Sequence, residues 1–88
     1  MYVITSHTLN RAKQAGLEVR PSTKANKKLD VYKDKEFVAS IGDRSYSDYG
    51  TYLKEQGKDV ANERRRLYHI RHKNNKGLEG TLAKILLW

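Results

Sequence analysis

The middle of the chain alternates between apolar and polar residues with a period of two. Residues 29–32 and residues 37–41 both show this alternation, and both are rich in β-branched and aromatic side chains. The pattern predicts two half-buried strands, with residues 33–36 as the connection between them. Residues 17–20 alternate in the same way until Pro21, a residue that sheets tolerate only at edges and strand ends, which predicts a short third strand.

Two segments outside these strands show the spacing of short helices. Ser6 or Thr8 can cap a helix that Gly16 ends, because a side-chain oxygen suits the first position and glycine suits the left-handed turn after the last. Tyrosine and leucine then recur at spacings of three and four between residues 46 and 53, which predicts a second helix that Gly57 ends.

Two further helices are predicted in the C-terminal third of the chain. The first begins with Asp59 as its cap and runs to about Lys73, and residues 74–77 break it. Apolar residues between 78 and 86 then fall at i, i+4, i+7 and i+8, the stripe of an amphipathic helix. We expect Trp88 to pack against the core.

These elements predict one α+β domain over residues 1–88. The expected architecture is a small β-hairpin or three-stranded antiparallel sheet packed against two to three short helices. A chain of 88 residues buries only about 60–65% of the surface that its unfolded form exposes, so its stability should be marginal. Assembly as a homo-oligomer or into a larger particle fits this prediction.

Composition removes several classes of protein. The chain has no cysteine, so disulfides and cysteine-based zinc sites are excluded. The first residues lack a basic segment followed by an apolar run, and no stretch approaches the roughly 20 apolar residues of a membrane span. The sequence therefore predicts a protein that is not secreted and has no membrane partner.

Charge is the most informative property of the composition. The net charge is +8, and residues 58–77 hold +5 of it, with seven Lys and Arg against two Asp and Glu. A segment this cationic attracts polyanions such as nucleic acid or an acidic protein.

A helical projection divides this basic segment into two faces. With an advance of about 100° per residue, Val60, Ala61, Leu67, Tyr68 and Ile70 gather on one face, which we expect to point inward. The opposite face carries an outward cationic strip of five side chains: Arg65, Arg66, His69, His72 and Lys73.

Two further arginines fall beside Leu67 on the inward side. Arg71, and with it Arg64, is expected to form a structural ion pair with Asp43 or Asp48, because a guanidinium at the edge of a core needs an acceptor.

For the outward strip, two interpretations stay open. One is an ordinary solvated helix face. The other is a surface that contacts phosphates, extended by Lys24, Lys27 and Lys28 if their loop lies alongside. The strip has no Asn or Gln to read base edges, so any nucleic-acid binding should be non-specific.

The remaining candidates for chemistry are few. His69 and His72 share a helix at i, i+3, but their neighbours are arginines, which repel a cation, so we expect no metal and no other cofactor. The sequence contains no phosphate loop, nucleophile elbow or zinc-protease motif, so we do not expect an enzyme. Tyrosines at positions 46, 49, 52 and 68 are expected to pack over the hairpin, with base stacking as the alternative.

The chain from Pro21 to Trp88 resembles a family of small basic proteins encoded by large DNA viruses and by phages. The resemblance is carried by five pieces: residues 21–28, residues 29–32, Ile41-Gly42-Asp43 with Tyr46 and Tyr49, Arg65-x-x-Tyr68-x-x-Arg71-His72, and a terminal Leu86-Leu87-Trp88. It departs from the family at the hairpin turn, where Asp34-Lys35 replaces a pair such as Asn-Gly, and in the first twenty residues, which have no counterpart.

The family has no established biochemical activity, so the resemblance implies a viral origin but indicates little about a reaction or a ligand. It implies a non-catalytic viral structural or virion-associated protein, located in the virion or the host cell interior. On this interpretation the basic helix meets packaged nucleic acid or an acidic viral protein. The alternative is a free, non-specific nucleic-acid-binding or regulatory protein that acts in the infected cell. A host-directed inhibitor is less favoured, because inhibitors of nucleic-acid enzymes are typically acidic.

Overall fold

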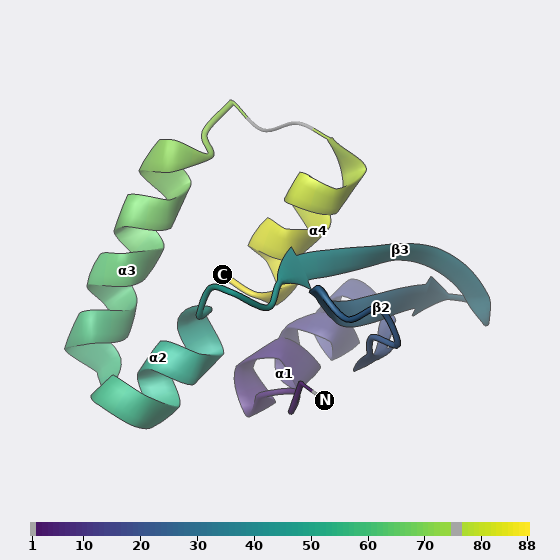
Figure 1. Cartoon of the computed structure of the whole chain (residues 1–88), viewed down its shortest axis with the longest axis horizontal. Coiled ribbons are helices and arrows are strands. Elements are labelled where there is room, and N and C mark those ends of the chain that lie inside the picture. Colours follow the sequence, from purple (N-terminus) through teal and green to yellow (C-terminus); the bar gives the residue numbers. More distant parts are fainter. Residues whose placement is uncertain (1, 75–76) are drawn as a thin grey trace.

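The computed structural model describes residues 2–74 and 77–88. In these residues the chain forms a three-stranded antiparallel sheet and four helices, which confirms the predicted α+β class. The elements follow one another as α1 (Ser6–Ala15), β1 (Glu18–Pro21), β2 (Lys27–Lys33), β3 (Glu36–Asp43), α2 (Tyr49–Gln56), α3 (Lys58–Arg71) and α4 (Leu78–Leu86). Figure 1 shows the sheet and the α2–α3 pair at opposite sides of the molecule.

The strands lie in the order β1-β2-β3, so β2 is the central strand. Leu29 on β2 lies opposite Ile41 on β3, and both side chains are fully buried, as the alternating pattern predicts. The connection is a two-residue turn in which Asp34 (φ 51°) and Lys35 (φ 69°) both adopt left-handed backbone angles. A tight hairpin turn needs two such residues, which is why Asn-Gly is commoner there.

The core lies between the sheet and helices α1 and α4. Helix α4 packs on β3, and α1 packs on α4, where the Thr8 hydroxyl donates to the Leu86 carbonyl at 2.8 Å. Trp88 is buried, as expected, and stacks on Tyr68 of α3 with 4.4 Å between ring centroids and 7° between planes. This stack ties α3 to the end of α4.

The starts of helices α1, α2 and α3 differ from the predictions. Thr5 caps α1, in place of Ser6 or Thr8. Gly57 precedes α3, which begins at Lys58 with no side-chain cap, so Asp59 lies in its first turn.

Helix α2 begins later than predicted because Asp48 accepts a hydrogen bond from the Thr51 amide at 2.9 Å and fixes the first turn there. Tyr46 consequently lies before the helix. Its side chain is 70% exposed and does not pack over the hairpin.

Candidate polyanion-binding surface

Helix α3 packs through a narrower face than the helical projection predicts. Ala61 and Tyr68 are buried, as expected, but Leu67 is 37% exposed and Ile70 is 54% exposed. The projection placed the large aliphatic side chains inward. In the structure the small side chain of Ala61 lets α3 approach α2 closely, and the Tyr68 ring covers Trp88. The packed face is therefore rotated away from the leucine and isoleucine.

This rotation brings two members of the predicted outward strip toward the core. The Arg65 guanidinium lies 3.8 Å from the ring centroid of Tyr49, and it donates to the Asn62 side chain and the Trp88 carbonyl. The His72 ring stacks on Tyr68 at 4.4 Å. The strip of five is therefore not a single exposed surface.

The other three members of the strip are exposed, but they differ in their partners. Arg66 donates two hydrogen bonds to Glu63, one helical turn away, so its charge is neutralised locally. His69 and Lys73 are exposed side chains.

The expected ion pairs of Arg64 and Arg71 do not form within the part of the chain that the structure describes. Both arginines are exposed. Asp48 is fully buried and pairs with Lys28 instead, at 2.9 Å. Asp43 is exposed and accepts from the Ser45 amide. The pairing prediction is wrong because Lys28, on β2, reaches the Asp48 carboxylate from the sheet.

The three lysines expected to extend the strip lie in three different environments. Lys24 is exposed. Lys27 lies 3.7 Å from Glu79. Lys28 is only 4% exposed and neutralised by Asp48, so the prediction that it contacts phosphate is corrected.

Positive charges from three helices act on His69 of α3: those of Arg11 on α1, Arg65 on α3 and Lys84 on α4. We call these four residues the three-helix cluster. Burial and then the charges of Arg65, Lys84 and Arg11 lower the pKa of His69 below its ordinary value. The charges that lower the pKa of His69 are all positive, so positive charge from three helices gathers near this imidazole.

Packing of α1 on α4 holds this cluster in place. The Arg11 side chain donates from Nε to the Ile85 carbonyl at 2.8 Å, beside the Thr8 contact with Leu86. Arg11 and Lys84 are not among the binding residues predicted from the sequence, because neither lies in a local run of charge. Only the tertiary packing of distant helices places them beside α3.

His7 extends the same region toward α2. Its ring lies 4.6 Å from that of Tyr49, and the Tyr49 ring also lies against the Arg65 guanidinium. Burial and the charges of Arg11 and Arg65 lower the pKa of His7, against an opposing effect of Asp48. Its Nε2 atom is buried and has no hydrogen-bond partner among the described residues.

A second polar constellation surrounds Asp48. The Tyr2 hydroxyl donates to its Oδ2 at 2.6 Å, and the Lys28 ammonium donates to the same oxygen at 2.9 Å. Burial alone would raise the pKa of Asp48, but these two donors outweigh burial and leave the pKa below its ordinary value. Burial and the Asp48 carboxylate raise the pKa of Tyr2, so its hydroxyl stays protonated and remains a donor.

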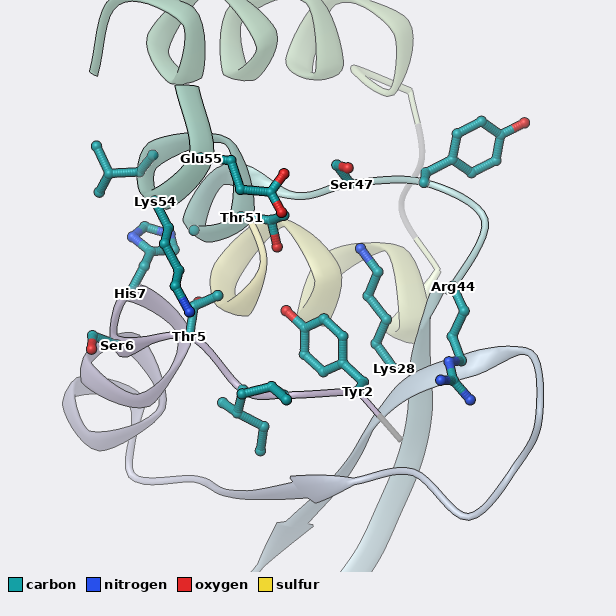
Figure 2. A pocket seen from close by; sticks show the side chains of 15 residues that line it. Tyr2, Thr5, Ser6, His7, Lys28, Arg44, Ser47, Thr51, Lys54 and Glu55 are labelled. Atoms are coloured by element: carbon teal, nitrogen blue, oxygen red, sulfur yellow. The ribbon is translucent and has the colours of Figure 1, made fainter. Parts of the chain in front are cut away.

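Beside this constellation lies a hollow of about 570 Å³. Figure 2 shows Tyr2 and Lys28 extending side by side within it, with Thr51 and Glu55 of α2 nearby and Arg44 at its edge. The innermost cation, Lys28, already has its counterion. We therefore assign the Tyr2–Asp48–Lys28 network to the stability of the fold.

Comparisons with protein-family models, with curated proteins and with solved structures found no match to this chain. In the part of the chain that the structure describes, no helix has the length and apolar character needed to cross a membrane.

Proposed function

We propose that this chain is a non-catalytic protein that binds nucleic acid through the three-helix cluster, by contacts with phosphates. The observation that carries the proposal is the gathering of positive charge near His69 by Arg11, Arg65 and Lys84, which come from three helices. Assembling like charges destabilises a folded chain, and a polyanion relieves that repulsion.

The chemistry of the surface favours binding without sequence preference. Arginine and lysine contact phosphates, which position a protein on nucleic acid but carry no base identity. The cluster contains no Asn or Gln, the side chains that pair with adenine edges. The overall charge of +8 would also speed encounter with a polyanion.

The setting for this binding rests on the resemblance to small basic viral proteins. We propose a structural or virion-associated role in which the cluster contacts the packaged genome. Mass spectrometry of purified particles tests this directly: the chain should be present at a fixed number of copies per particle. Its absence from particles would leave the alternative, a free nucleic-acid-binding protein in the infected cell.

The salt dependence of binding tests the phosphate contacts. Anisotropy of a labelled oligonucleotide should give a dissociation constant that weakens steeply between low and moderate salt. Lys84→Gln should reduce the slope of log K against log salt by about 0.7–0.9, the contribution of one phosphate contact. Lys33→Gln removes the same charge from the hairpin end and should leave the slope unchanged. Equal slopes for wild type and Lys84→Gln would contradict the proposed surface.

A further inference from the structure

A groove runs between α3 and α4, on the side of α3 where Leu67 is exposed. It has a volume of about 770 Å³, and its lining includes Leu67 of α3, Ala83 of α4, and Leu87 and Trp88 beyond it. Tyr46, which is 70% exposed, lies at the edge of this groove beside α2. The groove therefore combines an apolar floor with an aromatic ring available to a ligand.

The α3 wall of the groove is cationic. Arg64 and Arg71 both line it, both are exposed, and neither has a carboxylate partner among the described residues. Arg64 lies over the ring of Tyr52, with 5.4 Å between the guanidinium carbon and the ring centroid. The sequence predicted that carboxylates inside the fold would neutralise these two arginines. Because both are exposed, their positive charges are available to a ligand in the groove.

The opposite wall carries two carboxylates, Asp43 and Glu79. Hydrogen bonds from Ser45 and then the charges of Lys27 and Lys28 lower the pKa of Asp43, and Glu79 lies near Lys27. Both acidic groups thus have partners of their own, whereas the arginines across the groove do not. The unmatched charge of the groove is positive.

An occupant must therefore present flat or apolar groups to the floor and negative charge to the α3 wall. Unpaired bases joined by phosphates meet both requirements, because every base has a π-face that stacks on aromatic side chains and arginine binds the backbone. A duplex keeps its base faces stacked on one another and offers only phosphates and groove edges.

We propose that the groove between α3 and α4 receives bases of a single-stranded nucleic acid, with the strand's phosphates on Arg64 and Arg71. The proposal rests on the proposed function and deepens it: the three-helix cluster supplies affinity for any polyanion, and the groove selects single strands.

Three labelled probes of equal length separate the two surfaces: an oligo-dT strand, an abasic strand with the same phosphates, and a duplex. Stacking contributes about 1–3 kcal/mol per base, so one stacked base should make oligo-dT bind about 5- to 150-fold more tightly than the abasic strand. Tyr46→Ala should remove most of this preference without weakening binding of the abasic strand. Phe37→Ala, which removes an aromatic side chain 54% exposed on the hairpin, should leave the preference intact.

The outcomes distinguish the groove from the cluster. Equal affinity for oligo-dT and the abasic strand would overturn the groove proposal while leaving the polyanion surface in place. An unchanged preference in a folded Tyr46→Ala variant, verified by circular dichroism, would also overturn it. If none of the three probes binds, the proposed function itself fails, and a titration with an acidic amphipathic peptide would then show whether the groove takes protein instead.

Discussion

Lys28 and Asp48 form a buried ion pair whose partners are 20 residues apart, and the Tyr2 hydroxyl completes it. A buried charge is costly unless it is paired and hydrogen-bonded, so each of these groups depends on the others. Asp48 also caps α2 through the Thr51 amide. One carboxylate thus fixes a helix start and joins the N-terminal segment to the sheet.

Asp48→Asn should destabilise the fold by about 3–5 kcal/mol, because it leaves the Lys28 ammonium buried without a counterion while an asparagine can still cap the helix. Urea denaturation measures this change. The double variant Lys28→Met with Asp48→Asn should recover part of the loss. Glu63→Gln, which breaks an exposed pair, should leave the midpoint unchanged.

The same pair has a consequence at acidic pH. The folded pKa of Asp48 lies below the ordinary value of 3.8, so its contribution to stability is present above that pH and is lost as the pH falls below it. Equal free energies of unfolding for wild type and Asp48→Asn at neutral pH would contradict this account.

At the scale of elements, α3 packs through small and aromatic residues. Tyr68 lies between Trp88 and His72, with ring centroids 4.4 Å from each. Ile70, two residues further along, is 54% exposed. The stability of α3 therefore depends on the tyrosine stack and not on its largest aliphatic side chain.

Tyr68→Ala should cost about 3–5 kcal/mol, as do other deletions of buried aromatic rings. Ile70→Ala on the same helix should cost less than about 1 kcal/mol, because its side chain is largely in water. Thermal and urea unfolding of the two variants compare these directly. A larger loss of stability for Ile70→Ala than for Tyr68→Ala would contradict this account and support the inward face that the helical projection predicts.

The contrast between strands and α3 shows where sequence reasoning is sufficient. Strands follow from alternation, because a pleated strand with one buried face must alternate, and residues 29–32 and 37–41 do so. For α3 the projection ranked side chains by size and charge, which placed Leu67 inward and Arg65 outward. An arginine can pack its guanidinium on an aromatic ring, and Arg65 does this on Tyr49.

The charged surface could be predicted only in part. The run of arginines in α3 is visible in the sequence, but Arg11 and Lys84 join Arg65 and His69 only through the packing of three helices. Likewise, the partner of Asp48 had to be a cation within reach, and several were available along the chain. The residues near Asp48 in the sequence do not indicate which of several distant cations pairs with it.

At the scale of the whole molecule, positive charge is in excess at +8, and pairs such as Lys28–Asp48 and Arg66–Glu63 neutralise some of the cations locally. In the three-helix cluster, burial and then the positive charges of Arg65, Lys84 and Arg11 lower the pKa of His69. A bound polyanion reverses the effect, because negative charge favours the protonated imidazole.

Binding should therefore be linked to proton uptake. A ligand that raises the pKa of His69 binds more tightly as the pH falls from about 8 toward 5.5, because the imidazole becomes charged in the complex before it does in the free protein. His69→Gln should reduce this pH dependence. His7, on which Arg11 and Arg65 also act, should contribute to the remainder.

The most direct measurement is an NMR titration of the His69 ring against pH, in the free protein and with saturating oligonucleotide. The account predicts a pKa below the ordinary 6.5 in the free protein and an upward shift in the complex. The same His69 pKa with and without oligonucleotide would contradict binding at the three-helix cluster.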